Sequence, residues 1–343
     1  MAMLRFKSND AINFLGKLTP LRVINAAKIL VSYYFSKYTG LLWHWGLPIS
    51  LSIEPTTACN LRCPECPSGL RSFSRATGNV REEDFREIIN QLQQKLLYLI
   101  FYFQGEPFIH PKFLDMVSMA SAKGLYTITS TNGHFLDNDR AKQTVKSGLD
   151  RLIVSIDGTT QDTYTAYRRE GSLEKVIAGT KNLIKWKKSL ASKTPHIVFQ
   201  FLVVAQNEHQ IPEIYQLADE LGVDEVKLKT AQVYNYKYGN PLIPQNEEYA
   251  RYRKKSDGTY ALKHSISNEC WKMWHSAVIT WDGQVVPCCF DKDASNVMGS
   301  MDYENFETIW NGQRYKEFRR RLLSGKAEID ICQNCTEGCK VWA

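Results

Sequence analysis

Residues 49–66 read ISLSIEPTTACNLRCPEC, and this stretch decides the fold. Segment 49–54 is short and apolar at alternate positions, which predicts a strand. Three cysteines, Cys59, Cys63 and Cys66, follow in the loop after that strand. Because α/β barrels carry their chemistry in the loops at the carboxyl ends of their strands, this loop is the candidate active site.

Short apolar runs alternate with segments of helical period from residue 48 onward. The predicted strands cover residues 49–54, 97–103, 126–130, 151–156, 197–204 and 225–229. The predicted helices cover residues 82–95, 111–123, 137–147, 172–188 and 211–221. Most of these strands are nearly continuous in apolar residues, as in parallel strands that are buried on both faces. Six β-α units in a row predict an α/β fold, a partial (β/α)6 TIM-like barrel.

The pattern changes after residue 231. Segment 233–260 is rich in Tyr, Asn, Pro, Lys and Gly and predicts a connecting or lid segment. Strands at 276–281 and 284–290 flank Asp282-Gly283, a strong hairpin signal, and a helix is predicted over 306–323. We therefore predict an N-terminal helical extension (1–47), the barrel (48–235) and a cysteine-rich C-terminal domain (236–343).

Composition and charge narrow the function classes. The 343 residues are 43% hydrophobic and 23% charged, values typical of a globular protein. Residues 1–45 hold six basic residues against one acid, 6 − 1 = +5 of the formal charge of +7. Since the rest of the chain is close to neutral, no nucleic-acid partner is predicted. The basic, aromatic-rich segment 1–45 predicts either a helix packed on the catalytic body, the reading we favour, or peripheral contact with a membrane surface.

The cellular location bears on the nine cysteines. No stretch is apolar enough to span a bilayer, and no signal peptide is recognisable, so the expected location is cytoplasmic. Disulfides are rare in that compartment, and thiolates there commonly bind zinc, copper(I) or iron–sulfur clusters. Three ligands without an obvious fourth in the first group indicate a four-iron cluster with one open iron. A structural zinc loop is the alternative, although such sites close with four ligands.

The first cysteine group resembles the signature of the radical S-adenosylmethionine (SAM) superfamily, a C-x3-C-x2-C loop after the first strand of a partial barrel. The resemblance covers residues from about 50 to 235. It implies that Cys59, Cys63 and Cys66 hold a [4Fe-4S] cluster whose open iron binds SAM. The residue before the third cysteine is often aromatic in this family. Here it is Glu65, whose backbone can still contact adenine.

The same resemblance implies further SAM contacts. Gln104, Gly105, Glu106 and Pro107 resemble the GGEP segment that receives the SAM ammonium group, where glycine permits close approach. Other expected contacts follow later strands. Thr131 and Asn132 belong to a segment that resembles the family's TNG sequence and ends in Gly133, and Ser155 and Asp157 are expected to accept hydrogen bonds from the ribose. Arg168 is expected to bind the SAM carboxylate, with Arg169 as its substitute, and Gln200 is a weaker candidate contact.

The second cysteine group resembles the SPASM and twitch domains that bind auxiliary clusters in radical SAM enzymes. The Gly-x4-Cys spacing from Gly283 selects Cys288 over its neighbour Cys289, since adjacent strand residues point to opposite faces. The expected ligands of one auxiliary [4Fe-4S] cluster are Cys270, Cys288, Cys332 and Cys335, with Cys339 able to replace Cys335. A zinc ribbon is the alternative for this group.

The resemblance implies an enzyme that reductively cleaves SAM to a 5′-deoxyadenosyl radical, which abstracts a hydrogen atom from substrate. Four auxiliary cysteines favour electron transfer, hence a two-electron oxidation that ends in dehydrogenation or bond formation. The implied partners are a flavodoxin or ferredoxin-type electron donor and a small-molecule, lipid-linked or peptide substrate. A peptide maturase that makes crosslinks or epimerises residues is one alternative. A zinc-stabilised scaffold without catalysis is an alternative of a different class.

Overall fold

The computed structural model describes residues 8–263 and 265–335. The chain forms two compact units. Unit 1 comprises Met1–Thr57, Phe73–Ile128 and Ile266–Ala343, and unit 2 comprises Ala58–Ser72 and Thr129–Ser265. The candidate auxiliary cysteines of the described chain lie in unit 1, and the first cysteine loop lies in unit 2. The division at residues 47 and 235 stays a prediction.

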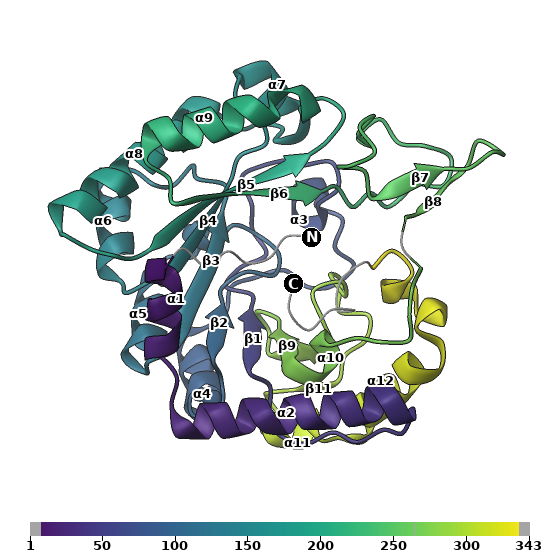
Figure 1. The fold of residues 1–343 in the computed structure, drawn as a ribbon. Coiled ribbons are helices and arrows are strands. Elements are labelled where there is room, and N and C mark those ends of the chain that lie inside the picture. Colours follow the sequence, from purple (N-terminus) through teal and green to yellow (C-terminus); the bar gives the residue numbers. More distant parts are fainter. Residues whose placement is uncertain (1–7, 264, 336–343) are drawn as a thin grey trace. The chain divides into compact units, whose positions relative to one another are not determined.

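A mostly parallel sheet forms the centre of unit 1 (Figure 1). Its strands are β1 (Ser50–Ile53), β2 (Tyr98–Ile100), β3 (Tyr126–Thr131), β9 (Ser276–Ile279), β10 (Gln284–Val286) and β11 (Gly299–Ser300), in the spatial order β11-β10-β9-β1-β2-β3. β9 pairs parallel to β1, with Ser50 opposite Ser276, and β10 pairs antiparallel to β9 and β11. The predicted hairpin at Asp282-Gly283 is thus confirmed, and it continues the sheet that begins with β1.

Helices accompany this sheet in unit 1, and some of them bury an apolar stripe. They are α1 (Ser8–Gly16), α2 (Pro20–Thr39), α4 (Glu82–Leu92), α5 (Phe113–Ala122), α10 (Lys272–His275), α11 (Phe306–Trp310) and α12 (Gln313–Gly325), with 3-10 turns η1 (Pro107–Ile109), η3 (Lys326–Glu328) and η4 (Asp330–Cys332). In α4, for example, Phe85, Ile88, Ile89 and Leu92 are buried at helical spacing.

Unit 2 carries the later β-α repeats. Its parallel strands are β4 (Arg151–Ser155), β5 (His196–Val203) and β6 (Glu225–Thr230). Its helices are α3 (Pro67–Leu70), α6 (Asn138–Lys146), α7 (Gln161–Tyr167), α8 (Leu173–Ser189) and α9 (Ile211–Leu221), with the 3-10 turn η2 (Glu208–Gln210). Figure 1 shows α8 and α9 running along these strands. The predicted α/β fold with a parallel sheet is confirmed.

The structure corrects one sequence expectation and adds detail to another. The single helix predicted over 306–323 is two helices, α11 and α12, because Gly312 has extended backbone and caps α12. Segment 233–260 is predicted to be a connecting or lid segment, and the structure adds an antiparallel hairpin of β7 (Tyr252–Lys254) and β8 (Tyr260–Leu262) at its end. The dipeptide Asp257-Gly258 marks the turn and was a signal that sequence reasoning passed over.

Candidate active site

The first three cysteines lie together in unit 2. The Cys66 N–H donates to the Cys63 carbonyl at 3.3 Å, and α3 begins directly after Cys66. Gly69 of α3 packs on this loop so closely that an added Cβ would stand 2.6 Å from the Cys63 nitrogen. Sequence reasoning missed Gly69, because a helical glycine gives no local sign of the backbone it contacts.

Apolar side chains surround the loop. Cys63 is buried in a cluster with Leu61, Tyr167 and Val204, and Cys59 and Cys66 pack against that cluster. Burial raises the pKa of the Cys63 thiol, and the charge of Arg168 acts in the opposite direction. A thiolate here therefore needs a positive partner, which a bound metal cluster and Arg168 can both supply.

Arg168 lies beside Cys63 and is held by a buried carboxylate. Its Nη1 stands 3.8 Å from the Cys63 Sγ, and its Nε donates to Asp157 Oδ2 at 2.5 Å. The other oxygen of Asp157 accepts from the Leu202 N–H at 2.7 Å. Both Asp157 oxygens are thus used inside the protein, so this geometry makes Asp157 a positioning residue for Arg168. The predicted ribose contact of Asp157 and carboxylate contact of Arg168 stay predictions.

The other predicted residues of unit 2 group around Cys59 and Ser155. Asn132 Nδ2 donates to Asn60 Oδ1 at 2.7 Å and lies 3.9 Å from the Cys59 Sγ. Thr131 Oγ1 accepts from the backbone of the same turn, and Ser155 Oγ lies 3.5 Å from Ser130 Oγ. These positions leave amide and hydroxyl groups near the cysteine loop, as a polar ligand requires.

The Glu65 side chain is held by the segment that follows β6. Its carboxylate accepts from the Tyr234 N–H at 2.9 Å and from Asn240 Nδ2 at 3.5 Å. The expected contact with adenine would therefore come from the Glu65 backbone, and it stays a prediction.

The Gln104–Pro107 segment belongs to unit 1. Gly105 has φ +75°, a left-handed conformation that favours glycine, and Glu106 Oε1 accepts from the Phe108 N–H at the start of η1. Gln104 Oε1 is buried, and no hydrogen-bond donor among the described residues reaches it. An acceptor left over in this way fits an ammonium ligand.

An ion pair in unit 1 connects the two ends of the chain segment that carries the first three cysteines. Glu54 follows β1 and is fully buried, and it accepts two hydrogen bonds from Arg75, at 2.6 and 2.9 Å. The Trp281 N–H donates to the same carboxylate at 3.2 Å. Because the chain between Glu54 and Arg75 contains all three cysteines, this pair fixes where their loop leaves and re-enters unit 1.

The auxiliary cysteines gather in unit 1. Cys270, Cys332 and Cys335 are buried, and the Cys335 N–H donates to the Cys332 carbonyl at 3.0 Å. Burial raises the pKa of Cys332 to about 12, and the charges of Cys270 and Cys335 add to this effect. Burial also raises the pKa of Cys288, again with Cys270 among the causes. Burial makes the free thiolate forms of these cysteines unfavourable, and the positive charge of a bound metal would stabilise them. The raised pKa values therefore fit metal ligands.

The neighbouring cysteines differ. Cys289 is exposed, with Lys272 Nζ 3.5 Å from its Sγ. Cys339 lies outside the described residues. Within those residues no three His, Cys, Asp or Glu side chains are arranged to hold a single metal ion.

A buried cation and a buried phenol lie together on α12, and the phenol is close enough to Cys288 to interact with it electrostatically. On α12 Tyr315 and Arg319 are both fully buried, with the guanidinium 4.7 Å from the Tyr315 ring. Burial raises the pKa of Tyr315, and the nearby Cys288 thiolate raises it further. Within the described chain, the Tyr315 hydroxyl and Arg319 Nη2 have no hydrogen-bond partner. The unused Tyr315 hydroxyl, near Cys288, fits a hydrogen-bond donor to an anionic iron–sulfur cluster.

Family models match both halves of this arrangement. Residues 53–218 match the model of the radical SAM superfamily, and residues 270–336 match SPASM, an iron–sulfur cluster-binding domain. The chain belongs to the radical SAM superfamily. Its cofactors are accordingly SAM and [4Fe-4S] clusters, and the chain is an enzyme.

Individual relatives span both domains of this radical SAM enzyme. The tungsten-containing aldehyde ferredoxin oxidoreductase cofactor-modifying protein of Pyrococcus furiosus is 26% identical, over 83% of this chain and 86% of its own. The PqqA peptide cyclase of Bradyrhizobium diazoefficiens is 24% identical, over 85% and 79%. The solved structure of Streptococcus suis SuiB bound to precursor peptide SuiA has a TM-score of 0.61 at 14% identity, over 92% and 76%, and shows the shared fold.

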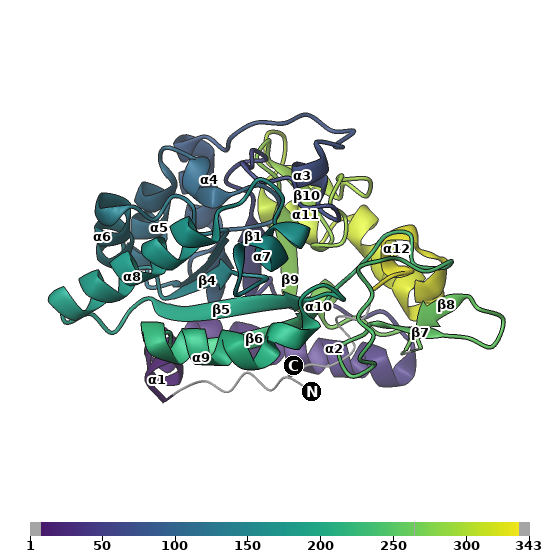
Figure 2. The same cartoon turned by 90° about the horizontal axis from the view of Figure 1, so that it is seen from above.

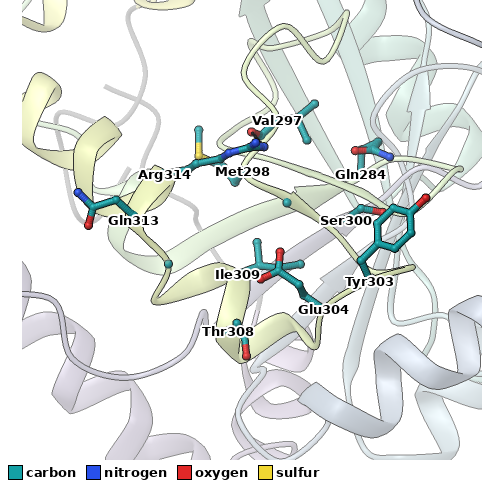
Figure 3. Close-up of a pocket in the computed structure, with 12 residues that line it drawn as sticks. Gln284, Val297, Met298, Ser300, Tyr303, Glu304, Thr308, Ile309, Gln313 and Arg314 are labelled. Atoms are coloured by element: carbon teal, nitrogen blue, oxygen red, sulfur yellow. Dashed lines mark hydrogen bonds between the residues drawn. The ribbon is translucent and has the colours of Figure 1, made fainter.

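A separate hollow of about 370 Å³ lies in unit 1 beside β10, β11 and α11 (Figure 3). Ile309, Ser300 and Tyr303 are among its lining residues, and no cysteine of the described chain lines it. This hollow is therefore distinct from the auxiliary cysteine site.

Proposed function

We propose that this radical SAM enzyme oxidises a peptide substrate by two electrons, with the auxiliary cluster as the electron acceptor. The similarity to a PqqA peptide cyclase across both domains carries the choice of a peptide. When bound, the first cluster and SAM supply the radical that abstracts the substrate hydrogen. The chain's own part is to hold Arg168 beside Cys63, to exclude water with the apolar cluster around Tyr167, and to bind the auxiliary cluster.

The buried auxiliary cysteines support the electron-accepting role. With four protein thiolates, a cluster has no open iron for direct substrate binding, so electron transfer is the role left to it. The first cluster needs a low-potential electron, and we include a flavodoxin or ferredoxin-type donor in the proposal. We also propose a cytoplasmic location at the membrane periphery. In the described residues no helix is long and apolar enough to cross a bilayer.

The test compares Cys332→Ala with Cys289→Ala after anaerobic reconstitution. The reaction mixture holds SAM, a chemical reductant and short peptides encoded beside the gene. We expect wild type and Cys289→Ala to remove two hydrogen atoms from a peptide, detected by mass spectrometry, with one 5′-deoxyadenosine formed per product. Cys332→Ala should still cleave SAM but form no oxidised peptide. Product formation by Cys332→Ala would refute the electron-accepting role, and turnover of small molecules alone would refute the peptide assignment.

A further inference from the structure

The exposed apolar side chains of the described chain are concentrated near its start. Eleven of the seventeen large hydrophobic residues that are exposed lie between residues 12 and 45. Scattered exposed apolar residues are ordinary, but a concentration of them marks an interaction surface. This surface belongs to α1, α2 and the segment that follows α2, all in unit 1.

Helix α2 exposes large apolar side chains. A helix on the surface of a protein in water normally turns its apolar stripe inward. In α2 the buried face mixes apolar and polar residues: Arg22, Asn25, Ile29, Ser32, Tyr33 and Ser36. Ile24, Val31, Phe35 and Tyr38 instead point outward, with 53, 53, 42 and 77% of their surface exposed. At 100° per residue these four lie within about 60° of one another around the helix axis, and we call them the outer face of α2.

Specific hydrogen bonds fix this orientation. The Arg22 guanidinium donates to the carbonyls of Lys17, Gln93, Lys123 and Gly124 at 2.5–3.2 Å. Asn25 Nδ2 donates to the Leu47 carbonyl at 2.7 Å, and Asn25 Oδ1 accepts from the Leu47 N–H at 2.9 Å. Because the Leu47, Gln93, Lys123 and Gly124 carbonyls precede β1, β2 and β3, Arg22 and Asn25 hold α2 against the amino ends of these strands. The helix therefore cannot rotate to bury its outer face.

Two tryptophans extend the outer face. Trp43 contacts Phe35 edge to face, with ring centroids 5.2 Å apart, and Trp45 stacks on Trp43. The Lys28 ammonium lies 4.8 Å from the centre of the Trp45 ring, at the rim of this surface. Tryptophan beside lysine is the composition that favours the boundary between lipid headgroups and acyl chains. Figures 1 and 2 show α2 and its flanking segment as one continuous stretch of unit 1.

The charge of this region selects an anionic partner. Asp10 is the single acid of residues 1–45, and it is buried, where it accepts from the Tyr126 hydroxyl. Among the described basic residues of the segment, Arg22 is buried and Lys37 pairs with Glu269 at 2.8 Å, so the outer face offers Lys28 beside Trp45 and no exposed acid from its own segment. A second copy of the chain would bring like charges together, whereas an anionic bilayer would be attracted.

We propose that the outer face of α2, together with Trp43 and Trp45, docks onto an anionic lipid bilayer with the helix lying in the plane of the headgroups. This inference specifies which surface of the protein would contact the membrane in the proposed peripheral location, and which lipid charge would attract it. It does not depend on the proposed peptide chemistry.

Vesicle sedimentation tests the proposal. The full chain is mixed with vesicles of phosphatidylglycerol and phosphatidylcholine, or of phosphatidylcholine alone. The variant Val31→Glu/Phe35→Glu is compared with Leu190→Glu/Tyr303→Glu, which adds the same charge at exposed apolar positions elsewhere. We expect binding to the anionic vesicles, a loss of about tenfold or more in the first variant, and near wild-type binding in the second. Binding should also weaken as salt rises.

Three outcomes would overturn the proposal: no binding by wild type, equal losses in both variants, or a wild-type dimer that Val31→Glu/Phe35→Glu dissociates in the absence of lipid. SAM cleavage without substrate, measured in each variant, reports whether the catalytic fold is intact. A variant that still cleaves SAM but no longer binds the vesicles shows that its substitutions affect the docking surface and not the catalytic fold. This result does not depend on whether the substrate is a peptide.

Discussion

Replacing Asp157 with Asn tests the buried pair that holds Arg168 beside the first cysteine loop. Asp157 is fully buried, and its Oδ2 accepts from Arg168 Nε at 2.5 Å. An asparagine of nearly equal size can still accept from the Leu202 N–H. The substitution therefore removes the charge that faces Arg168 and little else.

The expected cost follows from the burial of both partners. Breaking a buried ion pair by removing one partner costs about 3–5 kcal/mol, because the remaining charge is left without compensation. We expect about 3 kcal/mol here, since one hydrogen bond of Asp157 survives. That loss changes the unfolding equilibrium by roughly a hundredfold, a large part of the ~5–15 kcal/mol that stabilises a typical protein.

Urea unfolding of the metal-free protein measures this cost in a double-mutant cycle with Arg168→Met. With both partners removed the charges vanish together, so the double variant should lose about 2 kcal/mol less than the two single losses combined. Asp219→Asn makes the same change on the exposed face of α9 and should cost less than about 0.5 kcal/mol.

A coupling energy below about 0.5 kcal/mol would refute the assignment of Asp157 as the residue that positions Arg168. An unchanged free energy of unfolding in Asp157→Asn would also refute this assignment. Burial raises the pKa of Asp157, and a carboxyl that remained protonated at the assay pH would make asparagine its equivalent.

Three further perturbations address the cysteine sites and the core. Arg319→Met should destabilise the fold by about 2–3 kcal/mol in urea unfolding, because its buried guanidinium donates to the Met273 and Trp310 carbonyls, whereas the exposed Arg320→Met should cost less than about 0.5 kcal/mol. Gly69→Ala should reduce the iron bound by the first site, since its Cβ would meet the Cys63 backbone; full iron content would contradict this. Burial lowers the pKa of His275 to about 4, so the unfolded state binds the extra proton between pH 6.5 and 4. The free energy of unfolding should fall by about 3 kcal/mol over that interval and fall less in His275→Phe, and identical pH curves for the two proteins would argue against the shift.

Local sequence patterns predicted most elements of the fold. The apolar run at 49–54 became β1, and the Asp282-Gly283 signal became the β9–β10 turn, because both depend on neighbouring residues alone. The same reasoning joined 306–323 into one helix, since the helical period continues across the glycine that interrupts it. It also could not show that β9 pairs with β1, because the partner of a strand is set by contacts between distant parts of the chain.

The cysteine spacings, together with the position of the first group after a predicted strand, predicted the iron–sulfur chemistry and the superfamily of this protein, because ligand identity and spacing are properties of the sequence. Only the tertiary structure decided how the charged and apolar groups are used. It pairs Asp157 with Arg168, buries Arg319 against Trp310 and Tyr315, and leaves an apolar face of α2 exposed. The physical reason is that burial and pairing set the energy of a charge or an apolar surface, and both depend on which distant residues the fold brings into contact.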